Sequence, residues 1–245
     1  VQHDFMAGFP AGVERAWLQV RKVAWGAGDS SKGSAMTKTE CALAIAQGLE
    51  LVKELPGNVL LVGGMGIGNT SATALLLSRL AGLDVAQCTA VAPGSDATMM
   101  QHKVEVLRQV LLRHKRVTDP LDVLAAMGGL EIATMVGALL QAAQERRVVV
   151  VDGLLATSAV LVAHAVQPLI LQRCVFSHRS GESGHGLMLQ HLGVQALLDL
   201  DLRLGEGSGA ALAWPLLQSA CVLLREMASF ETAGVSKPVE SSIRT

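Results

Sequence analysis

The sequence predicts an α/β fold in which helices flank a parallel sheet that is buried on both faces. Short aliphatic runs at 59–62, 148–151 and 169–176 each lead through a glycine-containing turn into a helical pattern, the order typical of such sheets. The chain has 245 residues, of which 50% are hydrophobic and 17% charged, so it can bury one large core without a disulfide or a metal. Ligands of this fold class bind at the carboxyl ends of the strands, which makes the turns after these runs the candidate sites.

The predicted helices are marked by apolar periodicity and by signals at their ends. Residues 13–25 have helical apolar spacing and are followed by a glycine-rich loop. Thr37 and Glu40 form a capping box before the next helix, Gly82 marks a helix end, and Asp119 caps another helix. Further helices are predicted over 41–54, 71–81, 98–114, 121–127, 131–145, 156–166, 187–192 and 210–229.

Charge and composition disfavour several classes of function. The formal net charge is -1 and aromatic residues make up only 3%, so nothing favours binding to nucleic acid. The apolar runs 148–166 and 209–224 are interrupted by Asp152 and by Pro215, so we interpret them as buried elements rather than membrane spans. The first ten residues lack the basic flank and the apolar run of a signal peptide.

The four cysteines lie far apart in the sequence and form no CxxC pair. They are Cys41, Cys88, Cys174 and Cys221. We expect reduced, buried thiols with a structural role, as is usual in a cytoplasmic protein.

The first candidate site is the turn 63–70, GGMGIGNT, between a predicted strand and a predicted helix. Glycines such as Gly66 and Gly68 would let the backbone approach an anion, and the helix N-terminus would stabilise its charge. Asn69 stands where a P-loop has its lysine, and the dinucleotide-binding spacing is not met, so NTP hydrolysis and dinucleotide binding are disfavoured. The alternative is a tight strand-to-helix turn that Asn69 or Thr70 caps.

The second candidate site is the turn 92–96, APGSD, which opens the helix that contains Lys103. Gly94 and Ser95 could approach a phosphate, and Lys103 could supply positive charge. The alternative is that Ser95 or Asp96 only caps the helix and that Lys103 is an ordinary surface lysine.

The third candidate site is the predicted loop 177–185, SHRSGESGH, beside a strand end. Arg179, Ser180 and Gly181 offer hydrogen-bond donors there. Two histidines, His178 and His185, accompany Glu182, but they lack a well-placed third ligand, so a metal site is disfavoured.

The fourth candidate is Glu206, enclosed by glycines in GEGSG (205–209) just before a predicted buried helix. The glycines would let a substrate reach the carboxylate, and an apolar setting would raise its pKa toward that of a useful base. The alternative is a glutamate at a helix start, favoured there by the helix dipole. Three turns that could bind anions and one enclosed carboxylate together indicate a phosphorylated small molecule as the ligand.

Five segments, read together, resemble the nicotinate-nucleotide:dimethylbenzimidazole phosphoribosyltransferase family. They are GMGIGNTSATALL (64–76), DPLDVLAAMGGLEIATMVGALL (119–140), VVVVDGLLATSA (148–159), SHRSGESGH (177–185) and LDLDLRLGEGSGAALA (198–213). The resemblance implies a Rossmann-like parallel sheet with a smaller, mainly helical second domain, in a cytoplasmic homodimer that uses no cofactor and no metal. It implies transfer of the phosphoribosyl group of nicotinate mononucleotide to a base, usually 5,6-dimethylbenzimidazole, giving α-ribazole phosphate and nicotinate.

The resemblance also implies roles for individual residues. Glu206 matches the family's glutamate in LGEGTGA and would be the general base that takes the proton from the benzimidazole nitrogen. Glu131 matches a glutamate to which we assign no role beyond starting a helix. The predicted substrate-binding residues are Gly66, Gly68, Asn69, Thr70, Gly94, Ser95, Lys103, Asp152, Ser180, Gly181 and Gly205.

The sequence departs from the family pattern at several points. Gly64 replaces an acidic residue, and Asp96 replaces a glycine and would repel a bound phosphate. The family has a longer N-terminal region that contributes to the base pocket, so we expect 1–34 to be a remnant of the small domain, 35–231 the catalytic core and 232–245 a polar tail. The alternative function is a non-catalytic or heteromeric paralogue that binds a mononucleotide without turning it over alone.

Overall fold

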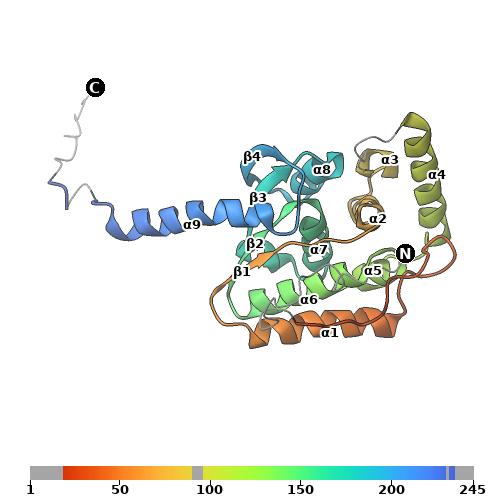
Figure 1. Cartoon of the computed structure of the whole chain (residues 1–245), viewed down its shortest axis with the longest axis horizontal. Coiled ribbons are helices and arrows are strands. Elements are labelled where there is room, and N and C mark those ends of the chain that lie inside the picture. The colour runs from red at the N-terminus through yellow and green to blue at the C-terminus, as the bar shows by residue number, and fades with distance from the viewer. Residues whose placement is uncertain (1–18, 90–95, 230–231, 235–245) are drawn as a thin grey trace, which may run out of the picture.

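A computed structural model describes residues 19–89, 96–229 and 232–234, and in this part of the chain four parallel strands form one sheet with helices around it (Figure 1). The strands are β1 (Val59–Val62), β2 (Val148–Val151), β3 (Cys174–Ser180) and β4 (Ala196–Leu202), and they lie in the sheet in chain order. Val62 pairs with Val151, and Val151 pairs with Phe176. The predicted α/β class with a parallel sheet is confirmed, and the carboxyl ends of neighbouring strands lie side by side.

The central strand β2 explains why an unbroken valine run can form a strand. Val149, Val150 and Val151 are all buried, to 0%, 0% and 1% exposure, because both faces of this strand are covered. The edge strand β4 is exposed along most of its length, and its sequence ALLDLDL alternates instead. The helix α7 (Gly153–Val166), which follows β2, is buried from Gly153 to Ala163 apart from one partly exposed position.

The remaining helices are α1 (Lys38–Glu54), α2 (Asn69–Ala81), α3 (Val85–Cys88), α4 (Ala97–Arg113), α5 (Pro120–Met127), α6 (Leu130–Gln144), α8 (Ser183–Leu192) and α9 (Ser208–Glu226). Most of them begin and end close to the predicted positions, although α8 begins four residues before its predicted start and α3 was not predicted. Both halves of the Thr37–Glu40 capping box are present, and Asp119 accepts hydrogen bonds from two backbone N–H groups of α5. Gly82 ends α2 in the left-handed conformation, as predicted.

The helices α1 and α6 approach each other closely through two glycines. A Cβ atom at Gly48 would lie 1.9 Å from the Thr134 carbonyl oxygen, and one at Gly137 would lie 1.9 Å from the Ile45 carbonyl oxygen. Each helix therefore lays its backbone against the other at a point where no side chain fits.

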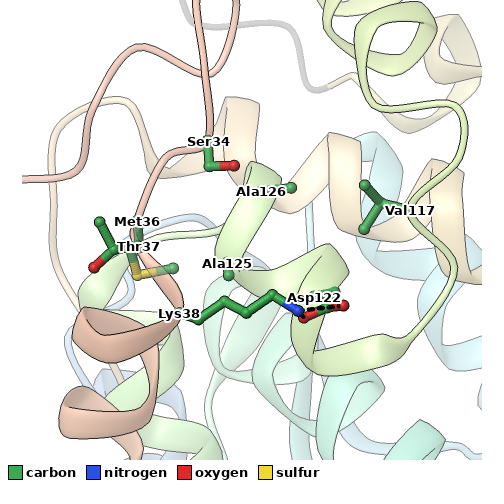
Figure 2. Close-up of a pocket in the computed structure, with 8 residues that line it drawn as sticks. All are labelled: Ser34, Met36, Thr37, Lys38, Val117, Asp122, Ala125 and Ala126. Carbon is green, nitrogen blue, oxygen red and sulfur yellow. Dashed lines mark hydrogen bonds and ion pairs between the residues drawn. The ribbon is translucent and has the colours of Figure 1, made fainter.

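The start of α1 is also held to α5 by an ion pair between Lys38 Nζ and Asp122 Oδ1, 2.6 Å apart (Figure 2). The pair lies at a cavity of about 400 Å³, which is lined by Ser34, Met36, Thr37, Lys38, Val117, Asp122, Ala125 and Ala126. This cavity shares no lining residue with the cavity at the strand ends described below.

Two predicted elements, the helix 13–25 and the strand 169–176, are wrong over part of their length. In the predicted helix 13–25, residues 19–25 are not helical and 13–18 lie outside the described residues. Instead, Val23 packs against the core and Arg21 pairs with Glu54, so tertiary contacts override the local periodicity. In the predicted strand 169–176, Pro168–Arg173 is a 3-10 helix with proline in its first turn, and the strand begins only at Cys174.

The later start of β3 changes the interpretation of 177–185. This segment was expected to be a loop, but its first four residues complete β3 and Ser183 begins α8. The strand β4 and the short helix α3 were not predicted.

The predicted burial of 209–224 is also wrong. The helix α9 extends away from the rest of the fold (Figure 1), and among its described residues only Gly209, Ala210 and Ala213 are buried. Cys221 is accordingly exposed and Cys174 partly exposed, whereas Cys41 and Cys88 are buried as expected. Within the described residues, no helix combines the length and apolarity that crossing a membrane would need.

Candidate active site

A cavity of about 170 Å³ opens at the carboxyl ends of β1, β2 and β3, where ligands of parallel sheets bind. It is lined by Gly64, Met65, Gly66, Asn69, Thr70, Thr73, Asp152, Gly153, Leu154, Leu155, His178, Ser180, Glu182, Arg203, Leu204 and Gly205. The turns after three strands and the segment after β4 therefore meet in one place.

The turn between β1 and α2 presents a helix N-terminus to this cavity. Gly68 is the N-cap of α2, with φ of 82° and no side-chain cap, so Asn69 and Thr70 do not cap the helix as the alternative proposed. Lys103 Nζ, from α4, lies 3.2 Å from Thr70 Oγ1. Burial lowers the pKa of Lys103, whereas the charge of Glu182 opposes that shift. A lysine and backbone N–H groups thus converge where an anion can bind.

The second predicted turn falls mostly outside the described residues, including Gly94 and Ser95. Asp96 is the N-cap of α4, and its Oδ1 accepts a hydrogen bond of 2.7 Å from the Met99 N–H. The capping alternative is therefore confirmed for Asp96.

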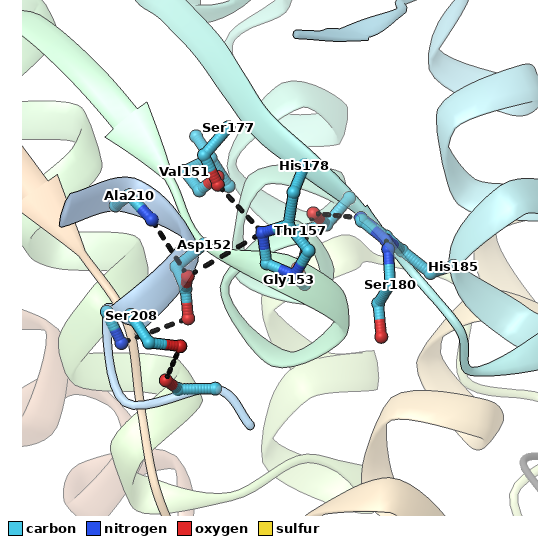
Figure 3. A network of polar contacts seen from close by, with 12 residues as sticks. Val151, Asp152, Gly153, Thr157, Ser177, His178, Ser180, His185, Ser208 and Ala210 are labelled. Atoms are coloured by element: carbon cyan, nitrogen blue, oxygen red, sulfur yellow. Dashed lines mark hydrogen bonds and ion pairs between the residues drawn. The ribbon is translucent and has the colours of Figure 1, made fainter. Parts of the chain in front are cut away.

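The end of β3 contributes Ser180, whose N–H donates a 2.8 Å hydrogen bond to Nδ1 of the buried His185. Nε2 of His185 lies 2.9 Å from Thr157 Oγ1, and that hydroxyl donates to the Gly153 carbonyl (Figure 3). Both ring nitrogens are therefore engaged within the protein and neither can ligate a metal ion. Burial lowers the pKa of His185 to about 4, and electrostatic interactions with the neighbouring His178 and Arg179 side chains act in the same direction.

Two of the donors predicted at 177–185 are used elsewhere. Arg179 Nη1 lies 3.6 Å from Asp199 Oδ2 on the neighbouring strand, and its side chain is 61% exposed. The N–H of Gly181 donates to the Leu202 carbonyl and extends the pairing of β3 with β4. Of the predicted donors Arg179, Ser180 and Gly181, Ser180 alone lines the cavity.

Asp152 follows β2 and is 2% exposed. Its Oδ2 accepts a 3.0 Å hydrogen bond from the Gly207 N–H, and its Oδ1 accepts another of 3.0 Å from the Ala210 N–H (Figure 3). One buried carboxylate thus caps the N-terminus of α9 and holds the turn that carries Glu206. This fastening role was not predicted from the sequence.

Glu206 lies in the turn that Asp152 holds. Gly205, Glu206 and Gly207 have φ values of 83°, 60° and 85°, so a non-glycine residue is kept in the left-handed region between two glycines. A Cβ atom at Gly63 would lie 2.2 Å from the Gly207 nitrogen, so this turn also packs directly on the β1–α2 turn. Glu206 is exposed and borders the cavity without lining it, so the expected apolar enclosure is not found in the described residues.

The structure brings most of the predicted residues together. Six line the cavity: Gly66, Asn69, Thr70, Asp152, Ser180 and Gly205. Gly68, Lys103, Gly181 and Glu206 lie beside it in sequence or in space. Sequence reasoning missed His178, Glu182 and Arg203 as cavity residues. His178 was considered only as a metal ligand, because 177–185 was expected to be a loop.

Residues 5–235 of the chain match a family model described as phosphoribosyltransferase. The chain belongs to this family. It is 61% identical over 237 residues to the nicotinate-nucleotide:dimethylbenzimidazole phosphoribosyltransferase of Variovorax paradoxus (strain S110), a match that covers 97% of this chain and 66% of the relative. The corresponding protein of Dechloromonas aromatica (strain RCB) is 46% identical over 242 residues, covering 96% of this chain and 68% of that relative.

Solved structures agree with the sequence relatives of this phosphoribosyltransferase family. CobT from Thermus thermophilus superposes with a TM-score of 0.84 at 36% identity, covering 89% of this chain and 66% of that one. The chain thus spans about two thirds of the length of the relatives it matches. The family resemblance inferred from the five motifs is confirmed.

Glu131 lies in the first turn of α6, as expected, and its Oε1 would lie 3.8 Å from a Cβ atom at the cavity residue Gly66. It is largely desolvated, and burial raises the pKa of its carboxyl group. No role beyond starting the helix follows from its contacts.

Proposed function

We propose that this chain transfers the phosphoribosyl group of nicotinate mononucleotide to a lower-ligand base such as 5,6-dimethylbenzimidazole, giving α-ribazole 5′-phosphate and nicotinate. The proposal rests above all on the turn of Glu206, which the buried Asp152 fastens to the edge of the strand-end cavity. The names of the two relatives, which contain nicotinate nucleotide and dimethylbenzimidazole, support it. We further propose that the protein acts in the cytoplasm as a homodimer.

The phosphate of the mononucleotide would bind at the start of α2. The backbone N–H groups that follow Gly68 carry no side-chain cap, and Lys103 lies beside Thr70. Ser180 approaches from the other side, at the end of β3. A positive side chain and a helix N-terminus together stabilise a phosphate by a charge-assisted contact.

The reaction centre would lie between the cavity and Glu206. The carboxylate of Glu206 would take the proton from a ring nitrogen of the incoming base. A nitrogen of that base would then form a bond to the anomeric carbon. The bond from that carbon to the pyridinium nitrogen breaks as the ring of nicotinate leaves with the electron pair. Because the leaving nitrogen becomes neutral, departure needs neither an acid nor a metal. Entry and departure on opposite faces invert the anomeric configuration and give the α-linkage.

The test is release of nicotinate by the purified chain. With nicotinate mononucleotide and 5,6-dimethylbenzimidazole we expect nicotinate and α-ribazole 5′-phosphate in equal amounts, and none without the base. Glu206→Gln should lower kcat by roughly 10²–10⁴, the usual contribution of a general base. Glu105→Gln, an exposed glutamate on α4, is the matched control and should keep full activity. Normal turnover by the Glu206 variant would refute the catalytic assignment.

The second candidate is a paralogue that binds the mononucleotide but does not turn it over alone. The exposed position of Glu206 outside the cavity favours it. This candidate predicts saturable binding of nicotinate mononucleotide without nicotinate release. Turnover by the purified chain would rule it out.

A further inference from the structure

The ring of His178 is held rigidly at the wall of the cavity. The side chain is 2% exposed and lines the cavity beside Asp152 and Gly153. A Cβ atom at Gly209 would lie 1.9 Å from Nδ1 of the ring, and one at Gly153 would lie 3.4 Å from Nε2. The ring therefore lies directly against two backbone segments and has little freedom to turn.

The surrounding hydrogen bonds determine which ring nitrogen carries the proton. The hydroxyl of Ser177 donates to the Val151 carbonyl at 2.8 Å, which uses its only proton. Nδ1 of His178, 3.0 Å from the same hydroxyl oxygen, must therefore donate to it. The Asp152 carboxylate, with Oδ1 3.7 Å from Nδ1, also favours a proton on that nitrogen (Figure 3). Nε2 is consequently left as a hydrogen-bond acceptor.

That acceptor faces the cavity. Among the residues that the structure describes, every fully buried side-chain nitrogen or oxygen has a hydrogen-bond partner. Nε2 of His178 has no protein partner within this part of the chain, so it must keep some accessible surface. The side chain is almost entirely enclosed and lines the cavity, so the cavity is where that surface lies.

We propose that Nε2 of His178 accepts a hydrogen bond from a ribose hydroxyl of the bound mononucleotide. This inference rests on the proposed function. An acceptor requires a donor, and nicotinate mononucleotide offers few: its phosphate and carboxylate are ionised at neutral pH, and its pyridinium nitrogen carries no hydrogen. The two ribose hydroxyls are its donors. His178 is thus a substrate-recognition residue that selects a ribose over a deoxyribose.

The experiment measures binding of three probes by calorimetry: nicotinate mononucleotide, its 2′-deoxy form and its 3′-deoxy form. The wild-type chain should bind one of the deoxy forms roughly tenfold more weakly, as expected for one lost hydrogen bond. His178→Asn keeps a donor toward Ser177 but removes the acceptor, so it should bind the parent nucleotide roughly tenfold more weakly and lose that discrimination. In His178→Gln the side-chain amide can reach the former Nε2 position, so this variant should keep part of the discrimination between the parent nucleotide and the deoxy form.

His191→Asn is the matched control, because His191 is exposed on α8. It should keep both the affinity and the discrimination. Equal binding of all three probes by the wild-type chain would overturn the inference, as would unchanged discrimination in His178→Asn. The inference would also be overturned if His178→Asn bound 5,6-dimethylbenzimidazole more weakly but bound nicotinate mononucleotide normally. The hydrogen-bond donor to Nε2 would then be the base and not the ribose.

The outcomes separate this inference from the proposed function. If the chain binds nicotinate mononucleotide but releases no nicotinate, the proposed transferase activity is refuted. The comparison of the three probes would still test whether His178 binds a ribose hydroxyl. If His178→Asn does not fold, the three probes with the wild-type chain and with His178→Gln still decide. Turnover with no discrimination between the probes would refute the role of His178 alone.

Discussion

The buried neutral state of His185 predicts that the folded protein loses stability in mild acid. Its Nδ1 accepts the Ser180 N–H, so Nε2 carries the proton that faces Thr157. A second proton on the ring would place two N–H groups against each other at Nδ1. Burial also opposes the charge, and the pKa of His185 is lowered to about 4.

The sign and size of the effect follow from the two pKa values. In the unfolded chain a histidine has a pKa of about 6.5, so between pH 6.5 and 4 the unfolded state binds more protons than the folded state. The contribution of His185 to stability is therefore fully present above pH 6.5 and falls as the pH is lowered toward 4. Over that window the loss amounts to roughly 3 kcal/mol, with a slope of at most about 1.4 kcal/mol per pH unit.

The assay is urea unfolding of the wild-type chain and of His185→Asn between pH 7.5 and 4. The asparagine can still accept the Ser180 N–H but does not titrate. At pH 7.5 the variant should be less stable by roughly 2–4 kcal/mol, because it leaves a small void and loses the contact with Thr157. That difference should shrink by roughly 3 kcal/mol at pH 4.

Comparing the two proteins cancels the titration of groups common to both. His191→Asn, the same substitution at an exposed position of α8, is the matched control for the cost of replacing a histidine by an asparagine. If the free energies of unfolding of the wild-type chain and His185→Asn changed with pH in parallel, the assignment of a neutral imidazole with a hydrogen bond at each ring nitrogen would be refuted.

Two further predictions concern the core and the fastened turn. Gly48→Ala should lower the free energy of unfolding by roughly 1–3 kcal/mol, because its Cβ atom would lie 1.9 Å from the Thr134 carbonyl oxygen. Gly33→Ala is the matched control, because a Cβ atom at Gly33 has nothing within 4 Å and, like Gly48, this residue does not have a positive φ. Asp152→Asn should replace one of the two carboxylate oxygens that accept hydrogen bonds by an amide NH₂, which cannot accept them. If Asp152 positions Glu206, kcat for nicotinate release should fall more than the affinity for nicotinate mononucleotide. An equal loss in both quantities would contradict that role.

Local sequence signals predicted many of the element ends, because the interactions that create those ends are local. The Thr37–Glu40 capping box and the cap at Asp119 join residues within three positions of each other. The two aliphatic strands β1 and β2 were likewise predicted to the residue. By contrast, the strand β4 carries charged residues and lies at the sheet edge, so its sequence lacks the aliphatic run that identified β1 and β2.

The site was predicted in part for the same reason. A glycine-rich turn after a strand indicates an anion site, and the cavity does include Gly66, Asn69 and Thr70. Asp152 illustrates the limit: the sequence placed it after a strand, but its partners are Gly207 and Ala210, more than fifty residues away. No local pattern encodes a contact of that range.

The sequence by itself determined the α/β class, the aliphatic strands, the helix caps and the glycine turns, because each depends on residues close together in the chain. Only the tertiary structure decided that α9 extends from the body, that 168–173 is a 3-10 helix, and that His178 lines the cavity. Those features depend on which distant segments meet.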